Sequence, residues 1–285
     1  MTDSADSGAR LFDVHTHFLP PRMRAKVLEQ FDTAGPLIGA EWPIRYRGDD
    51  DELVQTLRDL GVRRFSALAY AHRPGMAEWL NDWTSDFADR VPECLRCATF
   101  YPEPGVGEYV AARLAAGVQL WKVHVQVGAF YVTDPVLEPA WASIEAAGTP
   151  VVLHAGSGPV GTEFTGPGPV AELLDRHPDL PLVIAHLGAP EYPEFFDLAE
   201  RYPRVCLDTT MAFTDFFEKL GAPFPDRLLS AVRDLGLAGK VLLGSDFPNI
   251  PYAYEHQLVS LERLGLGEEW MQAVTWDNAT RLLGE

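Results

Sequence analysis

Cysteine is scarce in this chain of 285 residues, and its scarcity excludes a class of protein. Only Cys94, Cys97 and Cys206 occur, an odd number that is too small for a disulfide framework. This content fits a reducing compartment, and we expect a cytoplasmic protein. The opening MTDSADSGAR lacks the basic region and apolar core of a signal peptide, so residues 1–10 are expected to be a flexible tail.

Positive charge is also scarce. The 23 lysine and arginine residues are outnumbered by 41 aspartate and glutamate residues, which gives a formal net charge of -18 at pH 7. A surface of that sign repels phosphate backbones and anionic lipid headgroups. The chain is 47% hydrophobic, yet no run approaches the roughly 18 apolar residues of a membrane span. We therefore expect no nucleic-acid or membrane partner, and a small molecule as the substrate.

A glycine-rich phosphate loop is missing after the first strand candidate, which argues against a dinucleotide-binding fold. What the sequence does contain is a regular alternation of short apolar runs and amphipathic segments of helical period, such as 49–62, 75–91, 108–118 and 194–202. Such alternation predicts parallel strands with right-handed crossovers. The eight strand candidates span residues 11–17, 65–70, 95–100, 119–125, 150–155, 182–188, 204–210 and 241–246.

The placement of polar residues favours a closed barrel over an open sheet with the same alternation. An open sheet gathers its chemistry near one switch point, whereas a barrel collects it from the ends of strands around the ring. Polar residues end several well-separated candidates here. We therefore predict one α/β domain, a (β/α)8 TIM barrel over residues 11–285, with a long loop insertion at 18–49. This loop and the loop 156–169 both follow strands and are expected to be lids over the active-site face.

A histidine pair ends the first strand candidate. Side chains two apart in a strand face the same way, so His15 and His17 project together. Two neutral imidazoles can bind one ion, with zinc preferred and manganese or iron as alternatives. The motif is not isolated, because His154 ends the fifth candidate, His186 the sixth and Asp246 the eighth. Recurrence at four strand ends predicts a single metal-dependent site.

Six motifs in this order resemble the amidohydrolase superfamily, in the branch that contains aminocarboxymuconate-semialdehyde decarboxylase. The motifs are DVHTHFLP (13–20), KVH (122–124), LHAG (153–156), IAHLG (184–188), GSDFP (244–248) and DNATRLLG (277–284). The resemblance covers nearly the whole chain and implies a metal-dependent enzyme. Members of this branch often form homodimers, so a homodimer is one assembly that the resemblance allows.

The resemblance also implies roles for individual residues. His15, His17, His154 and Asp246 would be ligands of one divalent ion, most simply Zn²⁺, with Mn²⁺ or Fe²⁺ as alternatives. His186 would be the catalytic base beside a bound water, and Asp246 would take part in proton transfer as well as in ligation. A metal-bound water has its pKa lowered toward about 7, and a neighbouring imidazole can accept its proton during attack on a carbonyl.

Four further residues are assigned by the same comparison. Lys122 ends the fourth strand candidate, where binuclear relatives carry a carboxylated lysine that bridges two ions; we favour one ion and a Lys122 ammonium that pairs with substrate or a carboxylate. His124 and Phe247 are tentative substrate contacts. Asp13 is expected to hydrogen-bond a ligand imidazole and fix its tautomer.

The leading function is hydrolysis of a C–N or C–O bond in an amide, cyclic imide or lactone by metal-activated water. The alternative is nonoxidative decarboxylation of an aromatic or unsaturated carboxylic acid. A third reading, a non-catalytic ligand-binding barrel, predicts the loss of a metal ligand, and none is missing. Four arginines in loops could hold a carboxylated substrate, namely Arg22, Arg45, Arg47 and Arg73.

Other conspicuous residues have simpler interpretations. Cys94 and Cys97 are expected to be core residues rather than a zinc or redox pair, since no matching second pair of ligands lies nearby. The acidic run 49–52 is expected to favour a helix N-terminus. His177 and His256 lie in helical segments and are expected at the surface.

Overall fold

The computed structural model describes residues 10–284, so the predicted tail over residues 1–10 lies outside the described residues except for Arg10. Across the described part, eight strands alternate with helices. The strands are β1 (Leu11–Asp13), β2 (Val62–Phe65), β3 (Cys97–Thr99), β4 (Leu120–His124), β5 (Val151–His154), β6 (Leu182–Ile184), β7 (Val205–Asp208) and β8 (Val241–Leu242).

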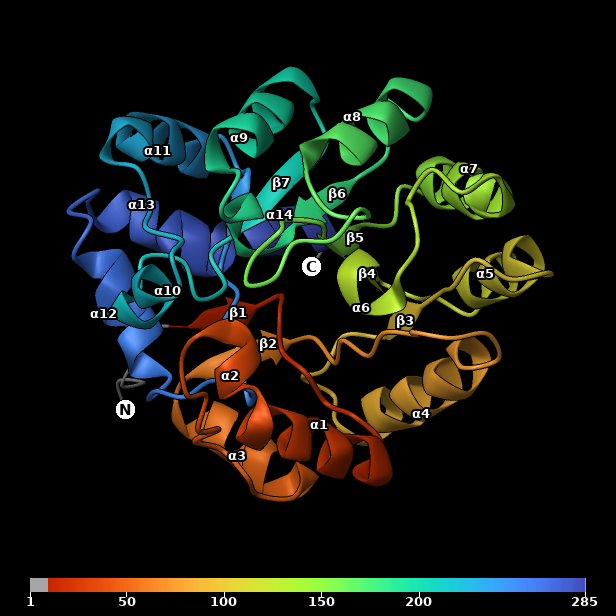
Figure 1. Ribbon diagram of the computed structural model, residues 1–285, viewed down its shortest axis with the longest axis horizontal. Helices are drawn as coiled ribbons and strands as arrows, with labels where there is room; N and C mark the ends of the chain where they lie inside the picture. The colour runs from red at the N-terminus through yellow and green to blue at the C-terminus, as the bar shows by residue number, and fades with distance from the viewer. Residues whose placement is uncertain (1–9, 285) are drawn as a thin grey trace, which may run out of the picture.

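The helices surround the strands, as Figure 1 shows. They are α1 (Pro21–Thr33), α2 (Gly35–Ile38), α3 (Asp50–Asp59), α4 (Ala77–Arg90), α5 (Val106–Ala115), α6 (Val125–Gly128), α7 (Glu138–Ala147), α8 (Pro167–Arg176), α9 (Tyr192–Arg201), α10 (Asp215–Lys219), α11 (Leu229–Leu237), α12 (Glu255–Glu262), α13 (Glu268–Gln272) and α14 (Asn278–Leu283). The segments predicted as helical from their period correspond to α3, α4, α5 and α9. Within residues 10–284, each helix is too short or too polar to cross a bilayer.

All strand pairs are parallel, and their order follows the sequence. The strands β3 to β8 form one six-stranded sheet, and β1 pairs with β2. Backbone hydrogen bonds join the two sheets at both seams: Leu95 donates to the Phe65 carbonyl at 2.8 Å, and Val14 donates to the Leu243 carbonyl at 2.9 Å. The predicted α/β barrel fold is confirmed.

Most of the strands are shorter than predicted, and β2 is displaced. It spans Val62–Phe65 rather than 65–70. The central residues of this strand, Arg63 and Arg64, are charged and at least partly exposed, so the segment does not stand out as an apolar run in the sequence. At the upper ends the ladder stops where the backbone turns. The φ angles of His186 and Asp246 are 55° and 68°, and a strand cannot continue through that left-handed region.

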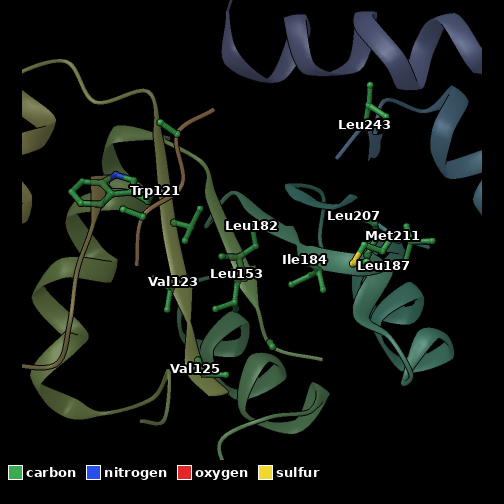
Figure 2. Close-up of a cluster of buried hydrophobic side chains, with 14 of the residues drawn as sticks. Trp121, Val123, Val125, Leu153, Leu182, Ile184, Leu187, Leu207, Met211 and Leu243 are labelled. Atoms are coloured by element: carbon green, nitrogen blue, oxygen red, sulfur yellow. The ribbon is translucent and has the colours of Figure 1, made fainter. Parts of the chain in front are cut away.

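Alternation along each strand separates two apolar layers. Val152, Val183 and Cys206 face the interior of the barrel in one cluster, together with Phe12 and Leu242. Their sequence neighbours face outward and pack under the helices; Figure 2 shows this outer layer, with Val123, Leu153, Ile184 and Leu207 among its labelled members. The inward positions therefore continue upward into the polar residues at the strand ends, which fixes where a site can form.

The segment 18–49 is not an irregular loop. It contains α1 and α2, and Trp42 anchors its end by donating its indole N–H to the Asn249 carbonyl at 2.8 Å. The run 49–52 begins α3 as predicted, with Asp49 and Glu52 forming a reciprocal capping box. The expectation that His177 is a surface residue is wrong: its ring is only 3% exposed and pairs with Glu145 at 3.0 Å, because an imidazole with a carboxylate partner can be buried at little cost.

Candidate metal centre

Three predicted ligands meet above the barrel interior. One ligand atom from each of His15, His17 and Asp246 lies within 4.8 Å of the other two. Asp246 Oδ1 is 2.9 Å from His17 Nε2 and 3.3 Å from His15 Nε2. Among the described residues, this is the group whose donors converge closely enough for one ion. The two histidines follow β1 and Asp246 follows β8, so two neighbouring strands supply the group.

The other nitrogen of each imidazole in this group has a hydrogen-bond partner. His15 Nδ1 lies 2.9 Å from Asp208 Oδ2, and His17 Nδ1 lies 2.7 Å from the Leu68 carbonyl. Donation from Nδ1 leaves both Nε2 lone pairs for a ligand. Burial, with the nearby Lys122 charge, lowers the pKa of His15 to about 4. The imidazole is therefore neutral at pH 7, which is the form that binds metals.

Asp208 is a residue that sequence reasoning missed. Besides His15 it accepts the backbone N–H groups of His186 and Thr210, each at 3.0 Å. Burial raises the pKa of this carboxyl, but the charge and hydrogen bond of His15 outweigh burial and lower it to about 2. One ionised carboxylate thus links β1, β6 and β7. Gly244 lets the backbone after β8 lie close to Thr210, since a Cβ at this position would be 2.1 Å from Thr210 Oγ1.

Asp13 does not have the role predicted for it. Its carboxylate accepts the backbone N–H of His15 at 3.1 Å and the hydroxyls of Ser245 and Tyr254 at 2.6 and 2.9 Å. It touches no ligand imidazole in these contacts. The reason is geometric: the Nδ1 atoms have other partners, which are Asp208 for His15 and the Leu68 carbonyl for His17.

His186 lies beside the converging group rather than in it. Its Nδ1 is 3.1 Å from the Thr210 carbonyl, which leaves Nε2 as the open nitrogen, 4.0 Å from Asp246 Oδ2. Both residues have left-handed backbone conformations. For residues other than glycine these cost about 1–2 kcal/mol each, and strain of this kind concentrates at functional sites. The position matches that expected for a proton acceptor.

His154 and His124 end neighbouring strands and stack with ring centroids 3.9 Å apart. His154 Nε2 contacts the Gly158 carbonyl at 3.2 Å, and its ring centroid is 4.8 Å from that of His186. Burial lowers the pKa of both imidazoles well below the usual value. The structure brings His154 to the same cavity but not into the group of three, so its role as a fourth ligand stays a prediction.

Lys122 is 1% exposed, and its Nζ donates to His15 Nε2 at 2.9 Å. The amine therefore points at the same centre as the metal donors rather than at an isolated carboxylate. Burial lowers the pKa of Lys122 to about 8, so it can act as a proton donor near neutral pH. A carboxylated Lys122 bridging a second ion stays the alternative.

A cavity of about 780 Å³ opens over these groups, which is within the usual size range for small-molecule sites. It is lined by His15, His17, Lys122, His124, His154, His186 and Asp246, and by apolar residues of the segment 18–49. Tyr70, also missed from the sequence, lines it too; burial raises the pKa of its phenol to about 12, so this hydroxyl is a donor. The loop 156–169 supplies Gly158, Pro159, Val160 and Thr162.

Two expectations about substrate contacts do not match this cavity. Phe247 is fully buried and packs on Tyr46 with ring centroids 4.8 Å apart; it lies in the layer behind the cavity because its backbone follows the turn at Asp246. The four loop arginines are exposed and do not line the cavity. Arg47, for example, is bonded to Asp32.

The donor set fits a divalent cation. Ligand atoms that surround a tetrahedral zinc ion at about 2.0–2.1 Å are about 3.3 Å from one another, close to the 2.9 and 3.3 Å separations found here. Burial raises the pKa of Asp246, but the nearby imidazoles outweigh burial and hold it well below the usual value. His15, His17 and Asp246 would therefore present two imidazole nitrogens and one carboxylate.

Three solved structures share the fold across nearly their whole length. An uncharacterised TIM-barrel protein of Bordetella bronchiseptica has a TM-score of 0.75 at 19% identity, covering 96% of this chain and 99% of that one. A 5-carboxyvanillate decarboxylase of Novosphingobium aromaticivorans, solved with manganese, has a TM-score of 0.67 at 12% identity, covering 98% and 97%. An Acinetobacter baumannii protein described as a probable 2-pyrone-4,6-dicarboxylic acid hydrolase, solved with citric acid, has a TM-score of 0.62 at 15% identity, covering 97% and 100%.

The sequence itself carries the family relationship. No functionally curated protein matches it at a significant level. The amidohydrolase family model matches residues 12–284, a span that includes β1 with its histidine pair and the terminal helix α14. The chain therefore belongs to the amidohydrolase family.

Proposed function

We propose that this enzyme hydrolyses a C–N or C–O bond of a small molecule, in an amide, cyclic imide or lactone. The observation that carries the proposal is the position of His186. Its open Nε2 faces the carboxylate of Asp246, 4.0 Å away, and that carboxylate is itself one of the three converging donors. A proton acceptor next to a cation site is the arrangement that water-dependent acyl cleavage needs.

His15, His17 and Asp246 would hold one divalent ion, with His154 as a proposed fourth ligand. The chemistry that such an ion supplies is Lewis acidity, which acidifies water and polarises a carbonyl oxygen. Zn²⁺ suits the two imidazoles and one carboxylate. Mn²⁺ is the alternative supported by the manganese in the decarboxylase of similar fold.

The protein groups would divide the remaining work. His186 Nε2 accepts the proton of the attacking water and returns it to the leaving nitrogen or oxygen, while its Nδ1 stays on the Thr210 carbonyl. Tyr70 and Lys122 line the cavity as donors and can stabilise the carbonyl oxygen as negative charge develops there. The raised pKa of Tyr70, caused by burial, keeps that donor protonated.

Nonoxidative decarboxylation is the second candidate, favoured by the decarboxylase of similar fold. It requires a carboxylate substrate, and guanidinium groups are the side chains best suited to bind one. No arginine is among the described residues that line the cavity. This observation supports hydrolysis over decarboxylation, since a neutral acyl compound needs no such partner.

Metal analysis of the purified protein followed by a substrate panel tests the proposal. Amides, cyclic imides and lactones are compared with ortho-hydroxy aromatic and unsaturated carboxylic acids, in water enriched in ¹⁸O. Incorporation of ¹⁸O into an acid product with about one ion per chain is the expected result. Release of carbon dioxide from the acids would replace hydrolysis by decarboxylation, and about two ions per chain would make Lys122 a metal ligand.

A further inference from the structure

The helix α1 has an apolar face that is only partly buried against the core. Met23, Val27 and Phe31 follow one another at four-residue spacing, so they lie on one side of the helix. None of the residues of α1 is buried, yet all three of these side chains line the cavity. An apolar helix face normally packs wholly on the core. Here the three side chains contact the core on one side and border the space above the metal centre on the other.

Apolar contacts connect this face to the catalytic group. The Phe217 ring stacks on His186 with centroids 5.8 Å apart and lines the cavity. Its neighbour Phe216 contacts Trp42 at 4.9 Å, and Trp42 contacts Phe31 at 5.1 Å. Phe217, Trp42 and Phe31 all line the cavity, so aromatic rings occupy its wall beside His186 and beside α1.

The length of the wall sets the size of what it can cover. Met23 and Phe31 are eight residues apart, which corresponds to about 12 Å along a helix axis. The wall continues into α2, where Leu37 lines the cavity with 74% of its surface exposed. An exposed leucine at the mouth of a cavity gains stability when a ligand covers it.

Charge along the cavity points the same way. The described lining residues hold two lysines and no arginine. Lys122 is buried against His15, and Lys26 lies on the exposed side of α1 at the rim. The cavity therefore has a polar floor at the histidines and a mainly apolar wall, in which Lys26, Gln30 and Thr33 are the polar members from α1. Its described lining has no cluster of lysines or arginines for a di- or tricarboxylate.

We propose, on the basis of the function proposed above, that the substrate is a neutral lactone or amide with an unbranched alkyl tail of several carbons. The tail lies along Met23, Val27 and Phe31, and the acyl group lies at the histidines. In the reaction, water adds its oxygen to the carbonyl carbon, and the ring C–O or the amide C–N bond breaks. His186 transfers the water proton to the leaving atom, so the product is a hydroxy acid or an acid and an amine.

Equilibrium binding tests the tail separately from turnover. The probes are γ-lactams with 5-alkyl groups from methyl to octyl, which are poorly hydrolysed analogues, and binding to the metal-loaded protein is measured by calorimetry. We expect the dissociation constant to fall about fourfold per methylene, the effect of burying one such group, until the wall is covered. A dissociation constant independent of chain length overturns the proposal.

Paired substitutions locate the tail. Val27→Asp puts a carboxylate on the cavity face of α1 and should weaken binding of the octyl lactam at least tenfold, with little effect on the methyl lactam. Ala25→Asp is the matched control, because Ala25 is exposed on the same helix and does not line the cavity. If Val27→Asp unfolds the protein, Leu37→Asp at an exposed position replaces it. Equal binding by cavity-face and control variants contradicts the proposed path.

The two proposals fail in different ways. Tight, length-dependent lactam binding without hydrolysis of any lactone or amide leaves the tail site standing and refutes the proposed function. Hydrolysis with a kcat/KM that does not change with tail length supports the proposed function and refutes the tail site. Alkyl lactones of increasing chain length provide this second measurement with the same protein preparation.

Discussion

Asp208 lies outside the cavity lining but contacts two residues of the site, His15 and His186. A single carboxylate fixes the tautomer of His15 and holds the backbone of His186 in its turned conformation. The proposed ligand His15 and the proposed base His186 are therefore aligned by the same group, although they come from β1 and from the turn after β6. An outer partner of this kind is expected to affect metal affinity and proton transfer together.

Replacing Asp208 by asparagine tests this coupling. The amide keeps the shape but removes the charge that favours donation from His15 Nδ1, so we expect metal affinity to fall about 10–100-fold. Competition with a chromogenic chelator measures it. Asp234→Asn, a change of the same kind at an exposed residue, should leave affinity unchanged. An Asp208→Asn protein with normal metal affinity would show that the pair is only structural.

His186→Asn separates the base from the ligands. The variant should keep its metal content and lose at least about 100-fold in kcat, the usual effect of removing a positioned proton acceptor. His256→Asn is the control, because this histidine pairs with Asp215 on the outside of the molecule. Loss of the metal in His186→Asn would instead place His186 among the ligands.

His154 could be predicted because it ends a short apolar run with the same parity as the interior Val152, and His15 and His17 because they form a histidine pair after the first such run. Asp208 follows the same rule, two residues after the inward-facing Cys206, but a lone aspartate in VCLDTT carries no metal-binding pattern. Its role depends on distance to His15, a residue 193 positions away. Sequence spacing contains no such information, and the misassignment of Asp13 has the same origin.

At the level of elements, amphipathic periodicity predicted the helices best where one face packs on the barrel. α3 is an example, with Leu53, Val54 and Leu57 buried on one side. The segment 18–49 was harder to predict, because no residue of α1 is fully buried and its apolar residues border a cavity as well as the core. Strand ends were predicted too long, since the turns at His186 and Asp246 depend on tertiary hydrogen bonds.

The N-terminal cap of α3 provides a stability test. Asp49→Ala removes the hydrogen bond in which the Glu52 backbone N–H donates to Asp49 Oδ1 at 3.0 Å. The other half of the pair, from the backbone N–H of residue 49 to Glu52 Oε2, can still form. We expect a loss of about 1 kcal/mol, or about 2–4 °C in Tm for a domain of this size. Asp51→Ala, in the same first turn but exposed, should cost less. Thermal unfolding followed by circular dichroism measures both.

For the whole molecule, two concentric apolar layers leave the three cysteines without access to solvent. Burial raises the pKa of Cys97 to about 12 and of Cys206 to about 11, and it raises that of Cys94 well above the usual value. All three thiols are free in the structure. These groups are therefore protonated at any pH near neutrality and lie in the core, as expected from the sequence.

Thiol titration at pH 8 checks this arrangement. In the folded protein, none of the three thiols should react with a chromogenic disulfide reagent over several minutes. The thiolate is the reactive form, and all three cysteines are buried. After denaturation all three should react. Rapid reaction of one thiol in the folded protein would show that the barrel opens near that strand.

The left-handed backbone at His186 and Asp246 has a consequence for the evolution of this enzyme. Glycine adopts that conformation more readily than histidine or aspartate does, so a glycine at either position should relieve strain while it removes a group that the proposed chemistry needs. A laboratory selection for thermal stability alone would therefore tend to enrich inactive variants at these two sites. Activity and stability oppose each other here, at residues where the sequence has kept activity.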